Sequence, residues 1–220
     1  MAALFAKSPS LTATDLLNPG QAGKREQTKA ANRRAILDAA RLVFAELGYE
    51  SASVRDIIRR TNLSVGAFYN YYRSKEEVYE ALSDDGARRF RPILQAQYEA
   101  SADFETFIRR AIDAYYNFLV AEQAAVQPTS GGVEAHPHVR AETPEMQAVF
   151  EQVKWSVSDV LERGHGPKVD LDYLAAACIA IAREVGELML ERRPIDVPAA
   201  VEFAVQLILG GLPALPRLKP

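Results

Sequence analysis

The sequence is poor in the side chains that carry most enzyme and metal chemistry. Its 220 residues include one cysteine and three histidines. A single cysteine excludes an internal disulfide and favours a reducing, cytoplasmic compartment. The histidines, His136, His138 and His165, all fall in segments rich in glycine or proline, where a general base is poorly held. We therefore expect no catalytic residues, no bound metal and no cofactor.

Further absences narrow the class of protein. The chain has no Gly-rich phosphate loop after a strand and no nucleophile elbow. His136 and His138, with Glu134 and Glu142, are metal-ligand types, but their loop offers no second cluster of ligands. No uninterrupted apolar run approaches the roughly 18 residues that span a bilayer, and the N-terminus lacks a signal-peptide pattern. We expect neither an enzyme nor a membrane protein.

Basic residues are slightly fewer than acidic residues overall, but they are concentrated near the N-terminus. The net charge is −3, from 26 basic and 29 acidic residues. From Lys24 to Lys75 the chain has 11 basic and 5 acidic residues, net +6, which leaves 15 basic and 24 acidic residues elsewhere, net −9. A basic module on an acidic body is expected when one end of a protein meets nucleic-acid phosphates. The alternative is a merely solvated helix surface.

Three helix starts are packed into the segment from Ser53 to Glu77. Ser53 and Asp56 have the spacing of a helix N-cap whose third residue reaches back, as do Ser74 and Glu77, and Ser64 is a further N-cap candidate. This spacing leaves room only for a helix-turn-helix. The second helix of that motif has the size to enter a DNA major groove.

The preceding helix is expected at 28–47, with a glycine stop at Gly48. Its apolar stripe consists of Ile36, Ala40, Val43, Phe44 and Leu47. The helix-turn-helix would pack on this stripe through Ile57, Ile58, Leu63 and Phe68. Gly66 is a poor helix former, so its place in the second helix indicates a close approach by a groove edge or by the preceding helix.

This segment resembles a known family. The run from Leu63 to Tyr69 (LSVGAFY), followed by Tyr71-Tyr72 and Ser74-Lys75-Glu76-Glu77, is similar to the N-terminal signature of the TetR family of bacterial transcriptional regulators. The resemblance covers about residues 28–80. It implies a DNA-binding domain at 28–76 with a recognition helix at about 64–72.

The resemblance also implies which residues meet DNA. Ser53 and Arg55 would hold a phosphate or a guanine edge at the start of the first motif helix. Val65, Gly66 and Ala67 would lie nearest the bases, where only apolar or shape readout is open to them. Further contacts to phosphates and bases would come from Ser64, Tyr69, Asn70, Tyr71 and Lys75. The alternative for the tyrosines is packing between helices.

The rest of the chain is expected to consist of an arm before this motif and a second domain after it. Residues 1–27 show no helical period and are expected to form a flexible arm. Its basic end (Lys24, Arg25 and Lys29) would be able to reach an adjacent minor groove, and the alternative is a tail that makes no contact. Residues 77–220 are expected to form a second helical domain, giving an all-α chain of about nine helices. The helices of this domain are expected at about 74–98, bent or broken near Gly86 and Pro92, and at 103–123, 143–163, 170–192 and 197–210.

The last two helices are apolar on more than one face. Such helices favour a two-fold homodimer that packs through them, as the resemblance also implies, with an ordinary intrachain core as the alternative. The expected dimer residues are Leu174, Ile181, Val185, Leu188, Val201, Val205 and Ile208. Cys178, in the same apolar run, is expected to be a buried structural thiol. A dimer would place two recognition helices on a palindromic operator in double-stranded DNA.

The resemblance further implies a cavity for a small-molecule effector. The aromatic residues of 103–123 and 143–163 suit a largely apolar or aromatic ligand, with a plain aromatic core as the alternative. The expected lining residues are Phe107, Ala111, Tyr115, Phe118, Phe150 and Trp155, with Tyr116 and Asn117 as further polar-tipped candidates.

The sequence thus predicts a homodimeric, cytoplasmic, DNA-binding transcriptional regulator. Its mechanism is expected to be that of a repressor, released from the operator when an effector shifts the helix at about 74–98. The alternative is a DNA-anchored interaction protein, nucleoid-associated and partner-binding, that has no small-molecule effector.

Overall fold

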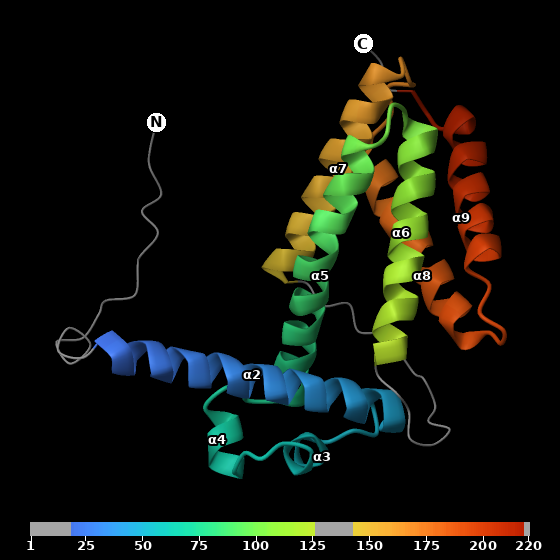
Figure 1. The fold of residues 1–220 in the computed structure, drawn as a ribbon. Helices are drawn as coiled ribbons and strands as arrows, with labels where there is room; N and C mark the ends of the chain where they lie inside the picture. Colours follow the sequence, from blue (N-terminus) through green and yellow to red (C-terminus); the bar gives the residue numbers. More distant parts are fainter. Residues whose placement is uncertain (1–18, 126–142, 218–220) are drawn as a thin grey trace.

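The computed structural model describes residues 19–125 and 143–217, and this part of the chain is helical with no strand. It contains eight α-helices and a final 3₁₀ turn, which confirms the all-α prediction. Figure 1 shows a bundle standing on a long helix that crosses its foot. The elements are α2 (Pro19–Leu47), α3 (Val54–Arg59), α4 (Val65–Tyr69), α5 (Lys75–Glu99), α6 (Phe104–Ala125), α7 (Pro144–Arg163), α8 (Leu171–Glu191), α9 (Val197–Gly211) and η1 (Leu212–Ala214).

The first described helix is longer than predicted. α2 begins at Pro19, so part of the segment predicted to be a flexible arm, 19–27, is helical. Residues 23–31 are all exposed. A helix with no buried face has no apolar period, and that period was the signal on which the predicted boundary rested.

Side-chain caps set the starts of the three short-spaced helices as predicted. The Ser53 side chain accepts from the Asp56 backbone N–H, and the Asp56 carboxylate accepts from the Ser53 N–H at 3.0 Å. Hydrogen bonds from Ser53 hold the pKa of Asp56 below its usual value. The hydroxyl oxygens of Ser64 and Ser74 also cap α4 and α5, accepting from Ala67 and Glu77 N–H groups. The predicted return bond from Glu77 differs, because its carboxylate accepts from the Arg73 N–H at 2.7 Å and not from that of Ser74.

The N-terminal domain has its own core between α2, α3, α4 and the start of α5. Ile36, Ile57 and Phe68 are fully buried there, and Val78 of α5 joins them. Leu47 was expected in this core but is 45% exposed. It is the last residue of α2, where the chain turns away at Gly48 with φ 75°.

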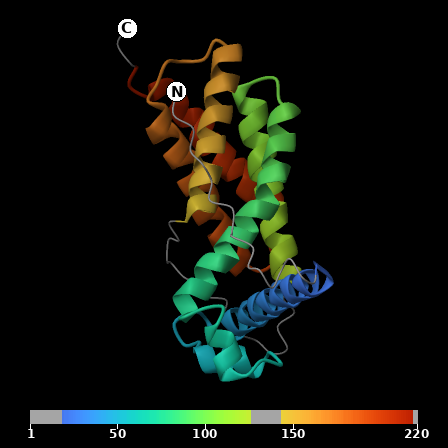
Figure 2. The same ribbon diagram turned by 90° about the vertical axis from the view of Figure 1, so that its left-hand side faces the viewer.

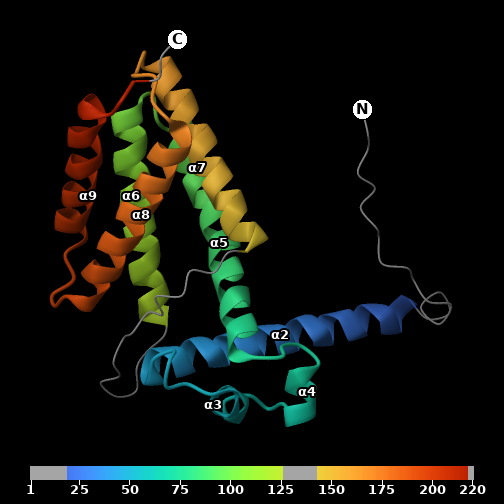
Figure 3. The ribbon, with the colours of Figure 1, turned by 180° about the vertical axis from the view of Figure 1, so that it is seen from behind.

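The C-terminal domain is a bundle of α5 to α9 with a second core. α5 belongs to both cores, because Val78 lies in the first and Phe90 and Leu94 in the second. Of the bend or break predicted near Gly86 and Pro92, the break is not present, since α5 is continuous across both. Pro92 is exposed, so the hydrogen bond that proline removes lies on the solvent side of the helix. One uninterrupted helix therefore connects the two domains (Figures 1 and 3).

One segment of the described chain is apolar and long enough to cross a membrane, judged by length and composition alone. It is the window Val197–Ala214, of which 22% is buried. Yet Val201, Ala204, Val205 and Ile208 within it pack into the core of the bundle. A single such helix is weak evidence for a membrane span, and the exposed remainder calls for a different explanation.

Candidate DNA-binding surface and ligand cavity

The recognition helix α4 presents one face outward. Phe68 is fully buried, whereas Val65 and Tyr69 are 57% and 52% exposed. A Cβ added at Gly66 would meet nothing within 4 Å. The preceding helix therefore does not explain this glycine, and its open side lies on the outer face with Val65. α4 is thus free to approach a groove over the face that the sequence predicted.

α3 adds cationic side chains to this surface. Arg55 is exposed, and no described residue forms an ion pair with it. Ser53 is also exposed, but its hydroxyl donates to the Asp56 carboxylate at 2.5 Å, so its first role is that of a cap. Arg59 pairs with Asp56 at 3.5 Å, and Arg60, just after α3, is paired with Glu46 of α2. Arg55 is accordingly the cation of α3 most available to DNA.

Two predicted contact residues have internal partners. Lys75 Nζ donates to the carbonyl oxygens of Tyr49, Glu50 and Ala52, at 2.8, 3.2 and 3.2 Å. It also lies 4.5 Å from the centre of the Tyr49 ring. With its donors directed at the α2–α3 loop, Lys75 is placed to hold that loop and not a phosphate. Sequence alone could not reveal this, because the carbonyls belong to the backbone.

Tyr71 and Asn70 lie at the far end of α4. The Tyr71 hydroxyl accepts from Asn32 Nδ2 of α2 at 3.0 Å, and the ring is half-buried. Asn70 is exposed, and so is Ser64 at the other end of the helix. Tyr71 therefore ties α4 to α2, as the alternative of packing between helices anticipated, while its neighbours stay open to a ligand.

A cavity of about 980 Å³ lies in the bundle between α5, α6, α7 and α8. Its volume is at the upper end of the range of small-molecule sites. Five of the six predicted residues line it: Phe107, Ala111, Tyr115, Phe118 and Phe150. The structure places Trp155 outside it, 55% exposed and packed 4.8 Å from the Tyr98 ring centre. Neither Tyr116 nor Asn117 lines it, since the first is buried in the core and the second is exposed.

The cavity wall is neutral, with a charged margin that sequence reasoning missed. Burial raises the pKa of the Tyr115 hydroxyl and of the Cys178 thiol to about 12, so neither ionises near neutral pH. Arg183, Glu184 and Glu187 of α8 line part of the same cavity. Their period of three to four residues was visible in the sequence, but only the packing of α8 shows that they border a cavity. The site therefore suits an apolar body with a polar or charged end.

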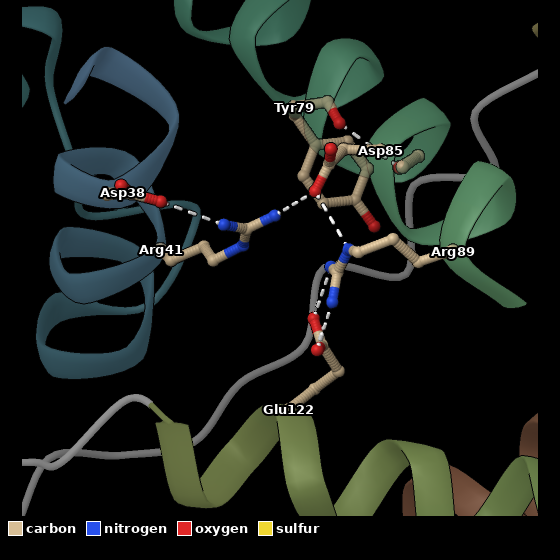
Figure 4. A network of polar contacts seen from close by, with 7 residues as sticks. Asp38, Arg41, Tyr79, Asp85, Arg89 and Glu122 are labelled. Carbon is tan, nitrogen blue, oxygen red and sulfur yellow. Dashed lines mark hydrogen bonds and ion pairs between the residues drawn. The ribbon is translucent and has the colours of Figure 1, made fainter. Parts of the chain in front are cut away.

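A chain of ion pairs runs from the N-terminal domain to the cavity wall (Figure 4). Arg41 of α2 donates to Asp38 at 3.0 Å and to Asp85 of α5. Asp85 also accepts from Arg89 Nε at 3.1 Å. Arg89 in turn forms a two-pronged ion pair with Glu122 of α6, one bond of which is 2.5 Å.

Arg89 also touches the cavity lining. Its guanidinium lies 5.5 Å from the ring centre of Phe118, one of the lining residues. Asp85 and Glu122 are 44 and 33 residues from their arginine partners in α2 and α5, so no local pattern could predict the pairs. The geometry connects three helices and both domains.

The predicted dimer residues fall into two groups. Leu174, Val201, Val205 and Ile208 are buried in the core of a single protomer, so the intrachain alternative holds for these four. Ile181 and Val185 are half-buried, and Leu188 is exposed. The exposed apolar residues of α8 and α9 are Tyr173, Leu188, Phe203 and Leu207. The sequence alone could not decide which apolar face of α8 and α9 packs into the bundle of the same protomer, and the dimer contact of these helices stays a prediction.

Metal ligands do not gather in the described part of the chain. Residues 19–125 and 143–217 contain no group of three or more His, Cys, Asp or Glu side chains that could hold an ion. The loop with His136 and His138 lies outside the described residues. His165 is exposed, with a positive φ of 53°, in the turn after α7.

Fold and surface together define a helix-turn-helix DNA-binding protein with a ligand-sized cavity. The sequence model described as "Bacterial regulatory proteins, tetR family" matches residues 36–82. Residues 36–82 are therefore similar to the DNA-binding domain of TetR-family regulators.

Individual proteins show the same relationship. The chain is 24% identical over 217 residues to the HTH-type transcriptional activator FasR of Mycolicibacterium smegmatis, covering 92% of this chain and 98% of the relative. It is 38% identical over 72 residues to the transcriptional repressor Rv1474c of Mycobacterium tuberculosis, covering 33% and 38%. The fold is similar to that of FadR from Bacillus subtilis, solved in complex with stearoyl-CoA, with a TM-score of 0.64, 16% identity and coverage of 81% and 98%.

Proposed function

We propose that the protein is a ligand-responsive repressor that binds a palindromic operator as a homodimer and is released by a small, largely apolar effector. The observation that carries the proposal is the continuity of α5. This helix starts just after the recognition helix, and its residues between Tyr79 and Leu94 line the cavity, so a shift of α5 caused by a ligand would reach the DNA-binding domain. No other described helix contributes to both cores.

The DNA-binding half of the proposal rests on α3 and α4. Val65 offers an apolar contact to a thymine methyl, while Asn70 is able to read a base edge with two hydrogen bonds. Arg55 and the Tyr69 hydroxyl reach toward phosphates. Because Phe68 is anchored in the core, α4 is presented as a rigid unit, which base readout requires.

The dimer would form through the exposed apolar face of α8 and α9. Tyr173 and Phe203 are 79% and 62% exposed in the single protomer. Leu188 is also exposed about four turns after Tyr173 on α8, and Leu207 is exposed one turn after Phe203 on α9. Exposed aromatic and aliphatic side chains in such number are characteristic of an interface. A dimer interface would also explain why only 22% of the apolar window Val197–Ala214 is buried in the single protomer.

The effector proposal rests on the cavity. Its apolar wall and charged margin match a molecule with a long hydrocarbon part and an anionic or polar end. The relative solved with stearoyl-CoA supports acyl compounds as the first class to test. Three probes, stearoyl-CoA, stearate and free coenzyme A, distinguish binding of the acyl chain from binding of the coenzyme A head group.

Transmission would use the ion-pair chain as well as α5 itself. A ligand against Phe118 displaces or tightens Arg89, which shares Asp85 with Arg41 of α2. Because Arg41 and Arg89 share the Asp85 carboxylate, we propose two arrangements of this contact. In one, Asp85 holds Arg41 and thus α2 more closely; in the other, Arg89 holds Glu122 and thus α6 more closely. The effector shifts the balance between them only to the extent that it binds one arrangement better.

The test combines two measurements. Selection from a random duplex pool identifies the operator, and fluorescence anisotropy of that duplex then measures the dissociation constant with and without each probe. The proposal predicts an at least tenfold rise in the dissociation constant with one acyl probe and none with coenzyme A alone. A dissociation constant unmoved by every probe, including a wider panel of apolar acids and esters, would remove the switch from the proposal.

The DNA-anchored interaction protein remains the alternative to this function. It predicts a close-packed bundle, whereas about 980 Å³ of cavity lies in the bundle here. It also predicts binding that follows salt concentration without sequence preference. The selection experiment therefore separates the two functions before any effector is known.

A further inference from the structure

The N-terminal part of α2 is a helix without a packing partner among the described residues. Every residue from 23 to 31 is exposed. The segment 24–34 contains five basic side chains and one acidic side chain, Glu26. A helix that is polar all round gains little from packing and still costs conformational entropy to order. Its cationic surface therefore needs a partner of opposite charge.

This segment forms one wall of a groove whose other wall belongs to the recognition helix. The groove has a volume of about 610 Å³. It is lined by Lys24, Arg25, Thr28 and Lys29 of α2, and by Asn70 and Tyr71 at the end of α4. In Figures 1 and 3, α2 runs past α4 and projects beyond it, while Figure 2 shows it obliquely across the foot of the bundle.

We infer that this groove, here called the flank groove, binds the DNA phosphate backbone immediately outside the half-site that α4 reads. The inference rests on the proposed DNA-binding function and extends its footprint. The flank groove is continuous with the recognition surface through Asn70 and Tyr71, so a duplex seated on α4 continues into it.

Charge and geometry favour phosphates over another partner. No described carboxylate forms an ion pair with Lys24, Arg25 or Lys29, so their charges are available to a ligand. Two lysines act as compact point charges toward phosphates and read no base edge by themselves. The Asn32 bond to the Tyr71 hydroxyl, at 3.0 Å, fixes the two walls relative to each other.

The position along the chain supports the same partner. The groove begins at Lys24, four residues or about 6 Å of helix, at 1.5 Å per residue, before the predicted start of the domain. That length corresponds to about two base pairs along a duplex, at 3.4 Å per pair. The contact would thus lie outside the bases that α4 can reach.

The test compares wild type with K24A/R25A/K29A on two duplexes. One carries the selected operator with flanks of about ten base pairs, and the other is trimmed to the half-sites. Alanine favours helix formation, so the substitutions should leave α2 folded, which circular dichroism checks. The control R110A/K168A/R192A removes three exposed cations far from the groove.

On the long duplex we expect the slope of log K against log salt to fall by about 2 to 3 per protomer for the groove variant, since each phosphate contact contributes about 0.9. Its preferred sequence should be that of wild type. On the trimmed duplex both proteins should bind with nearly equal affinity. The control variant should follow wild type on both.

Two results would overturn the inference while leaving DNA binding in place. One is a groove variant with the wild-type salt slope on the long duplex, and the other is a changed sequence preference, which would put the groove in base readout. A wild-type protein that selects no duplex would instead contradict the proposed function itself.

Discussion

Arg41 of α2 and Asp85 of α5 form an ion pair that connects the DNA-binding domain to the ligand-binding bundle. Both side chains are partly shielded, 26% and 33% exposed. The same Asp85 carboxylate accepts from Arg89, which pairs with Glu122 of α6 and lies over the ring of Phe118 in the cavity lining. A single carboxylate thereby takes part in contacts to both functional ends of the molecule.

Asp85→Asn should weaken the coupling between effector binding in the cavity and operator binding by the DNA-binding domain. The neutral amide leaves Arg41 and Arg89 facing each other without their shared counter-charge. Partly exposed ion pairs contribute about 1 kcal/mol or less to folding, so the variant should remain folded and bind DNA. The effect of an active acyl probe on operator affinity should shrink by about 3- to 30-fold, the range of a coupling change of about 0.5–2 kcal/mol.

Anisotropy titrations with and without the probe measure this ratio. Asp113→Asn is the control, because Asp113 is an exposed α6 residue whose side chain has no ion pair in the described chain. An unchanged ratio in Asp85→Asn would show that the pair is only structural.

Ala111→Phe should block effector binding by filling the cavity. Ala111 lines the cavity on α6, so the added ring occupies space that is otherwise open to a ligand. Operator affinity without effector should stay within about threefold of wild type, since α3 and α4 are untouched. Calorimetric binding of the active acyl probe should be lost, whereas Ala121→Phe on the exposed face of α6 should bind it normally. Normal binding in Ala111→Phe would mean that the effector sits elsewhere.

Lys75→Met should weaken folding first and DNA binding only as a consequence. The substitution removes three charge-assisted hydrogen bonds to the loop carbonyls. We expect the free energy of unfolding to fall by about 2 kcal/mol, the scale of hydrogen bonds to a charged group. Urea denaturation of Lys75→Met and of Lys168→Met, an exposed control, measures the difference. Undiminished stability with a smaller salt slope would restore the phosphate contact that the sequence predicted.

Arg55→Ala and Tyr69→Phe should weaken operator binding and leave the dimer intact. Each removes one polar contact from an exposed residue of the recognition surface, which corresponds to a loss of about 5- to 100-fold for the arginine and less for the hydroxyl. Sedimentation analysis checks the dimer, and Arg110→Ala is the matched control for arginine loss. A monomeric variant would mean that the residue supports the fold.

Cys178 should be nearly inert in the native protein. Burial raises its pKa from 9.0 to about 12, so the reactive thiolate is about 1,000-fold scarcer at pH 8 than an ordinary cysteine would give. Reaction with a thiol reagent should accelerate as pH rises toward 12, and unfolding in guanidinium should restore the ordinary rate. Equal rates in the native and unfolded states would contradict the buried, neutral thiol.

Local patterns predicted the helix-turn-helix well because its signals are short-range. Ser53, Ser64 and Ser74 cap helices within three residues of themselves, and Phe68 follows from a helical period of 3.6. The cavity residues came from a family resemblance, and five of the six line a cavity, four of them because α6 can turn only one apolar face inward. Their role as ligand contacts stays a prediction.

The misplaced residues all depend on long-range partners. Lys75 was assigned to phosphate because the carbonyls that it binds lie 23 to 26 residues away. Val205 and Ile208 were assigned to a dimer because an apolar helix does not reveal which neighbour covers which face. The start of α2 was missed because an exposed helix leaves no hydrophobic period to detect.

The most direct test of the regulator is selection of bound duplexes from a random pool, repeated at two salt concentrations. The account predicts an enriched palindrome, with half-sites spaced for a two-fold dimer and an affinity that falls steeply with salt. Binding that follows salt but enriches no sequence would contradict it, and would favour a protein that anchors a partner on DNA.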